Sequence, residues 1–561
     1  MGTISDKLMR IINTKEDIRK ALISKGYDVP TSVPFKEYAK MILDLPCKVD
    51  SFPDIEGIVA RYSASGLTNE QMAANPVWVD KTGNGYDLQL KNFSWKGMSG
   101  VGGYGDENYQ TFYKFTLDDY VFIASPPGVK HMNFTFRVTG LQPGNKLTLA
   151  FFGTTNTVYG TWKKDGIYTV DADIVEAGKP TYFYNGYSAT RGEFTIEILP
   201  LYPGALVFDG VDDYGACNNF PILTKEKGYT VVALRQWITY NPNAISAIAT
   251  NASDQSFNGA FTFENYNKGA EQTISYGATQ ISLQYSKSPF SWQTTSKYNG
   301  FNIANGNKDA TNSLVLGRSY PQRNEFANFA IWELVFLDHD ATEEELTKIK
   351  DYFVKTYPWL FPDRAWTVVG KTNENEDRAT IANITGNGND LVLSNFGFIE
   401  GSGYNEEGEY AGYLVTDGVD DEIISAKLIQ FADKFTIVGD WKFMEDRNDN
   451  AGLLKANQIY IYNATTGMKI YLKQGSKNYP FSCKKINALT SDGWVYDEKW
   501  DKYKVYPIGS HIDISSRLYL GFYSSNFTKI ALKNLGIYND QLLSKDDCIK
   551  AYNYLQTLKS K

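Results

Sequence analysis

The strongest constraint on the fold of this chain is a phrase that occurs twice. LVFDGVDDY at 206–214 and LVTDGVDDE at 414–422 agree at seven of nine positions and lie 208 residues apart. The agreement extends in both directions. TGNGYDLQL begins at Thr82 and TGNGNDLVL at Thr385, while LVLGRS begins at Leu314 and LYLGFYSS at Leu518. Repeated order over this length indicates that a whole domain has been duplicated.

The spacing of these landmarks locates an insertion in the first copy. The two TGNG phrases are 303 residues apart, whereas the two DGVDD phrases are only 208 apart. The first copy therefore carries 95 additional residues between them, within about 105–203. This segment has its own alternating runs, MNFTFRV, NKLTLAFF, GIYTV, PTYFY and GEFTIEIL, separated by turn signals such as LQPGN and KKDG. Short alternating runs between turns predict a small β-sandwich.

Strand patterns dominate each copy, and each copy ends in one helix. In YDLQLK the apolar Leu88 and Leu90 alternate with polar residues, as a half-buried strand requires. An aromatic share of 15% and 47 glycines suit β structure with many tight turns. Thr342 stands three residues before Glu345, and Ser544 three before Asp547, which is the signature of a capped helix start.

The DGVDD phrase, the LVLG strand and the closing strand-and-helix pattern resemble the concanavalin-A-like, laminin-G-like jelly roll. The resemblance implies a mostly β fold of tandem antiparallel jelly-roll sandwiches, one of them hosting the small β-sandwich. We expect the first jelly roll at 50–104 and 204–362, the insertion at 105–203 and the second jelly roll at 363–561. Members of this family mostly bind glycans or proteins, and some are hydrolases.

The first 49 residues have a different character and predict a short helical module. Apolar residues recur at helical spacing, and TKED at 14–17 reads as a fresh helix start. Three short helices of this length cannot bury a core of their own, so we expect the module to pack on a partner. The expected partner-binding face consists of Ile4, Leu8, Ile11, Ile18 and Leu22.

The segment NTKEDIRKALISKGYDVPTSVPFKEYAKMI resembles the N-terminal segment of fibre and tail-associated proteins of tailed bacteriophages, especially those of gut Bacteroidales. The resemblance covers about the first 45 residues. It implies a virion protein assembled in the cytoplasm of the bacterial host and joined to other virion proteins through its N-terminal helices. It also implies a homo-oligomer whose β domains project outward. An ordinary helical cap on the adjoining β domain is the structural alternative for this segment.

Signals of catalysis are scarce in this chain. His131, His339 and His511 are isolated, and nucleophile elbows, phosphate loops and HExxH pairs are missing. Jelly-roll hydrolases carry acids alternating along one strand, as in E-x-D-x-x-E, and no such strand occurs here. Glu193 and Glu197 share a face of a strand in the insertion, where a solvated pair is the ordinary interpretation. We therefore expect that the chain is not an enzyme.

Calcium is the one metal worth weighing, because laminin-G-like domains can hold it with loop carboxylates. The candidate ligands are the acids of the two repeated phrases: Asp209, Asp212, Asp213, Asp417, Asp420 and Asp421. The simpler interpretation is that these side chains cap turns. Duplication alone explains why they recur, so we expect no cofactor.

Charge and apolar content restrict the remaining partners. The net charge of −8 and the lack of long basic runs argue against nucleic-acid binding. No stretch has the length of apolar sequence that spans a bilayer, and charges interrupt the N-terminus where a signal peptide is apolar, so neither insertion nor export is expected. Four scattered cysteines, Cys47, Cys217, Cys483 and Cys548, indicate reduced thiols.

Together these features predict a bacteriophage virion protein, associated with a fibre, tail or head, whose lectin-like domains bind host-surface glycan or protein. Some loop phrases place Trp and Tyr beside Gly, Ser and Lys and suit such binding, namely FSWKGMSG, NTVYGTWKKDG, SPFSWQTTSKY and DGWVYDEKWDKYKVY. A purely architectural decoration or connector protein and a bacterial carbohydrate-binding protein are the alternatives. A glycoside hydrolase is the third.

Overall fold

A computed structural model gives the fold. It describes residues 15, 18–19, 52–104, 112–115, 120–124, 130–141, 146–151, 157–174, 181–186, 194–223, 228–238, 246–252, 262–265, 280–285, 310–318, 325–385, 388–406, 410–444, 451–456, 459–464, 467–472, 475–478, 486–497, 500, 502–504, 514–523 and 526–560. The chain divides into two compact units, residues 1–54 and 55–561. None of the helices in the described part is long and apolar enough to cross a membrane.

Little of the first unit is described. Lys15, Ile18 and Arg19 are helical and half-buried. Ile4, Leu8, Ile11 and Leu22 of the expected partner-binding face lie outside the described residues. The three-helix module and its partner therefore stay predictions.

The first jelly roll is built from two antiparallel sheets. One has the order β18-β15-β20-β13-β4, with β1 also paired to β20, and the other has the order β17-β16-β19-β14-β3-β2. The strands of the first sheet are β1 (Ile58–Ser63), β4 (Gly100–Val101), β13 (Leu206–Asp209), β15 (Thr230–Trp237), β18 (Gln280–Tyr285) and β20 (Asn328–Leu337). Those of the second are β2 (Val77–Trp78), β3 (Leu88–Lys91), β14 (Tyr214–Cys217), β16 (Ser246–Ala252), β17 (Thr262–Asn265) and β19 (Ala310–Leu316).

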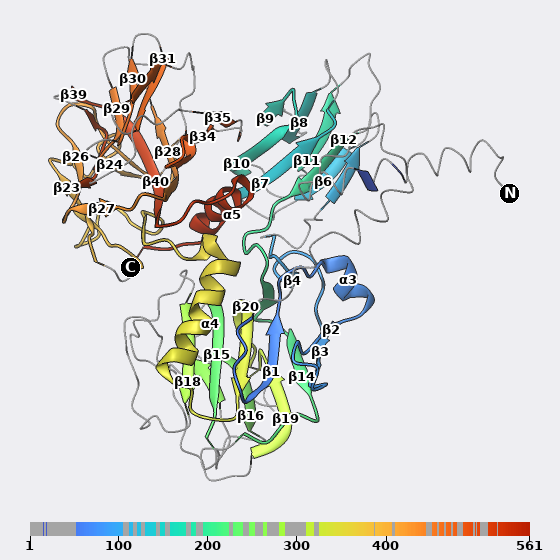
Figure 1. The fold of residues 1–561 in the computed structure, drawn as a ribbon. Coiled ribbons are helices and arrows are strands. Elements are labelled where there is room, and N and C mark those ends of the chain that lie inside the picture. The colour runs from blue at the N-terminus through green and yellow to red at the C-terminus, as the bar shows by residue number, and fades with distance from the viewer. Residues whose placement is uncertain are drawn as a thin grey trace. The chain divides into compact units, whose positions relative to one another are not determined.

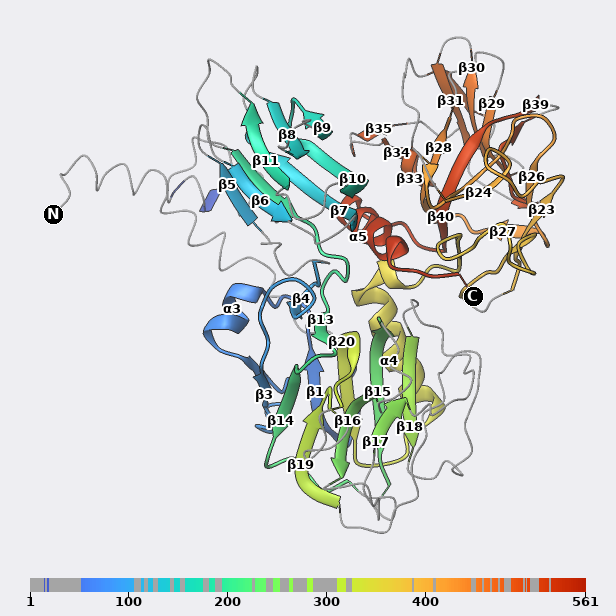
Figure 2. The same ribbon diagram turned by 180° about the vertical axis from the view of Figure 1, so that it is seen from behind.

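Burial along these strands follows their place in the sandwich. In β3 the apolar residues are buried and the polar residues exposed in strict alternation, because one face is covered and the other is wet. Every residue of β15 is buried, because helix α4 (Glu343–Thr356) lies along the outer face of its sheet (Figure 1). Figure 2 shows β14, β16 and β19 of the second sheet on the side opposite α4.

The insertion forms two sheets of its own, as the alternating runs indicate. Their orders are β10-β7-β12-β5 and β6-β11-β8-β9, all antiparallel. The strands are β5 (Phe112–Phe115), β6 (Tyr120–Ala124), β7 (Lys130–Thr139), β8 (Lys146–Phe151), β9 (Thr157–Trp162), β10 (Gly166–Ile174), β11 (Thr181–Gly186) and β12 (Phe194–Ile198). A separate core, centred on Phe136 and Phe183, fills the space between the sheets.

The second jelly roll repeats the plan of the first. Its sheets have the orders β24-β25-β40-β28-β33-β34-β35, with β21 paired to β40, and β22-β23-β26-β37-β29-β30-β31-β32, beside the pairs β27-β36 and β38-β39. The strands of the first of these sheets are β21 (Arg364–Thr367), β24 (Gly403–Asn405), β25 (Tyr413–Val415), β28 (Phe435–Phe443), β33 (Ile486–Thr490), β34 (Trp494–Asp497), β35 (Lys502–Lys504) and β40 (Ile530–Asn539). The remaining strands are β22 (Thr380–Ile381), β23 (Leu391–Ser394), β26 (Glu422–Ser425), β27 (Ile429–Phe431), β29 (Ala451–Ala456), β30 (Ile459–Ala464), β31 (Gly467–Leu472), β32 (Gly475–Asn478), β36 (Ile514–Ser516), β37 (Tyr519–Leu520), β38 (Phe522–Tyr523) and β39 (Asn526–Phe527).

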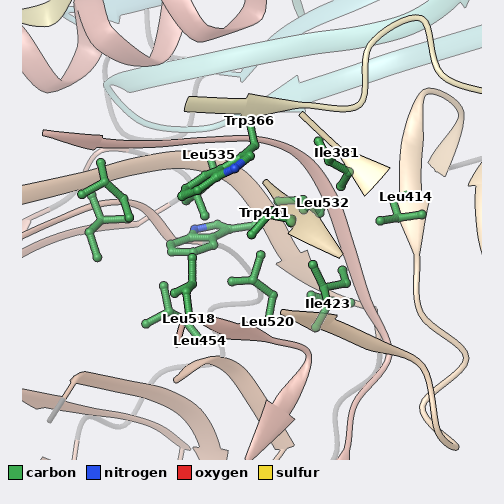
Figure 3. Packing of buried hydrophobic residues seen from close by; sticks show 14 of the residues in the cluster. Trp366, Ile381, Leu414, Ile423, Trp441, Leu454, Leu518, Leu520, Leu532 and Leu535 are labelled. Atoms are coloured by element: carbon green, nitrogen blue, oxygen red, sulfur yellow. The ribbon is translucent and has the colours of Figure 1, made fainter. Parts of the chain in front are cut away.

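Tryptophans occupy the centre of this second core. Figure 3 shows the rings of Trp366 and Trp441 one above the other, with Leu454, Leu518 and Leu520 beneath them. All five side chains are almost fully buried. The indole nitrogen of Trp366 donates to the carbonyl oxygen of Asn389 at 3.1 Å, so the polar atom of this buried ring is satisfied.

The closing helices begin where the capping signatures place them. The Thr342 hydroxyl accepts from the amide of Glu345 at the start of α4, and the Glu345 carboxylate accepts from the amide of Thr342. Ser544 accepts from the amide of Asp547 at the start of α5 (Lys545–Gln556). A mostly β fold of antiparallel sheets, closed by short helices, is thus confirmed. Two shorter helical segments in the described part of residues 55–561 are α3 (Asn69–Ala74) and the 3-10 turn η1 (Pro358–Leu360).

Candidate functional site

Each jelly roll presents the repeated phrase as one of two neighbouring loops. We call residues 92–100 with 209–213 the first loop pair, and residues 395–403 with 417–421 the second loop pair. In each pair the first loop follows a strand of one sheet, β3 or β23, and the second is the tight turn that joins β13 to β14 or β25 to β26. In the first pair the insertion separates the two loops in the sequence, whereas in the second pair they are close in the sequence.

A buried carboxylate joins the two loops of the first pair. The side chain of Asp213 accepts from the Ser99 hydroxyl at 3.0 Å through Oδ1 and from the amide of Asp209 at 3.0 Å through Oδ2. Asp213 is fully buried. One side chain therefore closes its own turn and ties it to the neighbouring loop.

The second loop pair repeats this arrangement. Asp421 accepts from the Ser402 hydroxyl at 3.0 Å and from the amide of Asp417 at 2.7 Å. Each pair has one further hydrogen bond between its two loops. Asn92 donates to the carbonyl oxygen of Asp212 at 3.0 Å, and Asn395 to that of Asp420 at 2.9 Å. The loop pairs are thus equivalent in their hydrogen bonds.

Burial changes the acidity of both inner carboxyls. It raises the pKa of Asp213 to about 7 and that of Asp421 to about 6, in each case against the opposing effect of the two hydrogen bonds that the carboxylate accepts. Neighbouring acids, Asp209 and Asp417, raise these pKa values further. Each inner carboxyl therefore holds its turn in place by hydrogen bonds. It also changes its protonation state near neutral pH.

The six aspartates named from the sequence do come together in threes. Ligand oxygens of Asp209, Asp212 and Asp213 lie within 4.8 Å of one another, and the same holds for the second copy. Two acids of the first set are engaged already, since Asp209 also accepts from the amide of Val211 at 2.7 Å. Calcium would have to displace such bonds, so these residues fit the role of turn caps better than that of metal ligands.

An aromatic residue in left-handed conformation marks the surface of each loop pair. Trp95 has a φ of 57° and Phe398, at the equivalent position, a φ of 51°. Bulky residues rarely adopt this conformation, and such strain concentrates at binding sites. Trp95 stacks on Phe93 with ring centroids 4.9 Å apart, and the guanidinium of Arg378 lies 5.0 Å from the centre of the Phe398 ring. Both aromatic side chains are half-buried and pack against the core of their own jelly roll.

Each loop pair also exposes an apolar side chain on its second loop. Val211 is 71% exposed and Val419, its equivalent, 70%. The two pairs differ at five positions, and at one of them the first has the exposed Lys96 and the second has Ile399, which is 64% exposed. An aromatic ring next to apolar and polar groups suits contact with a sugar ring or with a protein surface.

Other aromatic phrases named from the sequence belong to cores. Trp162 packs edge-on against Phe136, with ring centroids 4.8 Å apart, inside the insertion. Trp500 is buried and packs against Tyr552 of α5 at 5.7 Å. The phrase SPFSWQTTSKY lies outside the described residues. Of these phrases, FSWKGMSG alone contributes to a loop pair.

A second candidate site lies where the chain passes between the first jelly roll and the insertion. A cavity of about 220 Å³ opens there, and its polar lining comes from Thr68, Glu70, Tyr104 and Glu197. Sequence reasoning missed this site, because it treated Glu197 together with Glu193 as a solvated pair and overlooked Glu70. The signal that could have revealed this site is that Tyr104 and Glu197 lie near the two ends of the insertion, which must come together where the insertion joins the jelly roll.

Comparisons with known proteins give only distant structural likenesses. No family model matches the chain, and no curated protein matches it. Among solved structures, it is similar to Trypanosoma rangeli sialidase in complex with sialic acid, at 10% identity and a TM-score of 0.25, over 75% of this chain and 77% of that one. It is also similar to the botulinum neurotoxin serotype D binding domain, at 11% identity and a TM-score of 0.20, over 61% and 88%.

These matches correct one expectation. Since several are to a sialidase, the expectation that the chain is not an enzyme is overturned and withdrawn. That expectation rested on the lack of paired acids along one strand. The structure instead brings Glu70 and Glu197 to one cavity from distant positions. At these TM-scores the likeness assigns no activity to this chain.

Proposed function

We propose that this chain is a virion structural protein of a tailed bacteriophage, anchored by its N-terminal helices and carrying lectin-like domains that bind glycan or protein on the host surface. Two observations support the proposal. The first is the resemblance of the N-terminal segment to the heads of fibre and tail-associated proteins. The second, which carries the binding role, is the pair of equivalent loop pairs, each of which has an aromatic residue in left-handed conformation on one loop and an exposed valine on the other.

Duplication gives this arrangement a physical advantage. Two weak sites on one chain, multiplied again in a homo-oligomer, bind a surface with repeated receptors far more tightly than either site alone. The difference between Lys96 and Ile399 indicates that the two loop pairs prefer different parts of such a surface. Each inner carboxylate, held by a serine and a backbone amide, keeps its loop pair in one geometry before contact.

The experiment that tests the proposal has two readouts. Full-length protein and a version lacking residues 1–48 are compared for incorporation into phage particles and for saturable binding to host cells. We expect the truncated chain to bind cells but to be absent from particles. Incorporation without any cell binding would favour an architectural decoration protein. Failure of the full-length chain to join particles would overturn the virion role. Release of sugar from the cell surface is measured in the same samples.

A further inference from the structure

The cavity at the junction is framed by backbone hydrogen bonds. Where the chain enters and leaves the insertion, the amide of Gly102 donates to the carbonyl oxygen of Ala205 at 2.8 Å, and the amide of Tyr202 donates to that of Gly102 at 2.8 Å. The amide of Leu201 also donates to Gly103, at 2.8 Å. The two chain segments that connect the first jelly roll to the insertion therefore run side by side. Residues next to them, among them Tyr104 and Ile198, keep a defined place relative to β4.

The wall formed by α3 is tied to the same strand. The buried side chain of Asn69 accepts from the amide of Val101 at 2.7 Å and donates to its carbonyl oxygen at 3.2 Å. These two hydrogen bonds between the Asn69 side chain and the backbone of Val101 leave little freedom for α3 to move relative to β4. Glu70, the next residue, is exposed and lines the cavity.

Glu197 enters the cavity from the insertion and is oriented by a cross-strand partner. Arg137 on β7 lies opposite it in the strand register and donates to its carboxylate at 2.7 Å. A carboxylate with one oxygen engaged in this way keeps its other oxygen and its remaining lone pairs for a ligand. The pair also removes one of the two negative charges at the cavity.

The chemistry of the lining selects a class of ligand. Burial raises the pKa of the Tyr104 phenol, and the charges of Glu197 and Glu70 raise it further, so Tyr104 stays neutral and can donate a hydrogen bond. The two carboxylates accept hydrogen bonds only, so a ligand must bring hydroxyl donors. Apolar surface from Leu67 and Ile198 suits the C–H face of a sugar ring. The net negative charge opposes an anionic ligand.

We propose that this cavity is a subsite for a single neutral hexose residue of a glycan, held by hydroxyl hydrogen bonds to Glu70 and Glu197. The volume of about 220 Å³ is below that of sites for drug-sized molecules and suits one sugar ring. The inference deepens the proposed function, on which its biological meaning rests, by naming the ligand class. It also argues against sialic acid, whose carboxylate would face Glu70 and the net negative charge of the cavity.

The second jelly roll provides a matched control. The side chain of Asn373 donates to the carbonyl oxygen of Tyr404 at 2.8 Å and accepts from its amide at 2.8 Å. Asn69 forms the same two hydrogen bonds with Val101. Glu374 therefore stands where Glu70 stands in the first copy and is likewise exposed. No insertion interrupts the second copy, so the wall that Tyr104 and Glu197 supply has no counterpart in its sequence. Glu374→Gln changes the same chemistry away from the cavity.

The test uses the full chain with methyl glycosides of glucose, galactose and mannose as probes, and methyl sialoside as the anionic probe. Binding is measured by saturation-transfer NMR and titration calorimetry for the parent and for E70Q, E197Q, Y104F and E374Q. We expect saturable binding of at least one neutral hexoside, an affinity loss of about tenfold in E70Q and in E197Q, and no change in E374Q. Glu70 and Glu197 are both at the surface, so these variants should keep the parent's melting temperature.

Three results would overturn the subsite: no binding of any neutral hexoside, equal binding by E70Q and the parent, or competition by methyl sialoside. Its failure is distinguishable from failure of the proposed function. Hexoside binding by a chain that neither joins particles nor binds cells would keep the subsite and remove the virion role. Adsorption to cells by a chain that binds no hexoside would do the opposite.

Discussion

The hydroxyl of Ser99 and the carboxylate of Asp213, which are 114 residues apart in the sequence, meet at 3.0 Å in the buried centre of the first loop pair. Ser402 and Asp421 repeat the contact at the same distance, although they are only 19 residues apart. The insertion of a whole sandwich between Ser99 and Asp213 has therefore left their geometry unchanged. This constancy indicates that the bond serves the architecture of the loop pair in both domains.

Replacing Asp213 by Asn should flatten the dependence of stability on pH. The folded pKa of about 7 lies above the unfolded value of about 4. Between these values the folded chain keeps a proton that the unfolded chain has released, so the free energy of unfolding falls as the pH rises from about 4 to 7. Thermal unfolding between pH 4 and pH 8 measures this slope. It should be smaller in D213N and nearly the same as the parent's in D212N, because the exposed Asp212 makes only the smallest contribution to the raised pKa of Asp213. Equal slopes in all three proteins would contradict the account.

Gly210→Ala should destabilise the first jelly roll more than Gly66→Ala does. Both glycines have φ near 80°, where an L-residue costs about 1–2 kcal/mol. An added Cβ at Gly210 would lie 2.7 Å from Cβ of Asn328, whereas nothing lies within 4 Å of one added at Gly66. We expect G210A to lose about 1–3 kcal/mol more than G66A in denaturant unfolding. The difference between the two variants isolates the close approach from the cost of the backbone conformation.

Exposed valines of the loop pairs should matter for binding and not for stability. Val211→Ser and Val419→Ser remove apolar surface at equivalent tips that are about 70% exposed, so the free energy of unfolding should change by less than about 0.5 kcal/mol. If both loop pairs engage a cell surface, each single variant should weaken adsorption, and the double variant should weaken it by more than either one.

The matched control for these variants is Val158→Ser. Val158 is 56% exposed on β9 of the insertion, away from both loop pairs in the sequence. Adsorption by V158S should equal that of the parent. Adsorption that is equally weak in all the variants, V158S included, would show that loss of surface hydrophobicity, and not the loop pairs, causes the effect.

Local features of the fold could be predicted from the sequence alone, whereas the cavity could not. Alternation at Leu88 and Leu90 and the capping pair Thr342–Glu345 are local signals, and each predicts what the structure shows. The cavity depends on Glu70 and Glu197, which are 127 residues apart in the sequence and line it together only in the folded chain. No periodicity or local propensity reports such a long-range meeting.

The same reason explains why the bond between Ser99 and Asp213 could not be foreseen. The sequence repeats the aspartate visibly, but the serine lies in a different phrase, and its partner is set by the packing of two loops. Left-handed Trp95 was equally hidden, since an aromatic residue gives no local signal for this conformation. Loop residues that local propensities place poorly are the ones that form the candidate site.

A buried ion pair sets the last prediction, on the stability of the first jelly roll. Arg61 on β1 donates to Glu333 on β20 at 3.2 Å, and Tyr357 donates to the same carboxylate at 2.8 Å. Glu333 is fully buried, and this burial raises its pKa although Arg61 opposes the rise. Arg61→Ala would leave the acid without its cation, at a cost of about 3–5 kcal/mol.

The double variant R61M/E333L separates the loss of a partner from the worth of the pair. Removing both charges also removes the cost of burying them, so the double variant should recover most of the stability that R61A loses. Urea unfolding of the parent, R61A and R61M/E333L measures this. Should the double variant be as unstable as R61A, the pair itself, with the hydroxyl of Tyr357, would be a net stabilising element of the sheet that α4 covers.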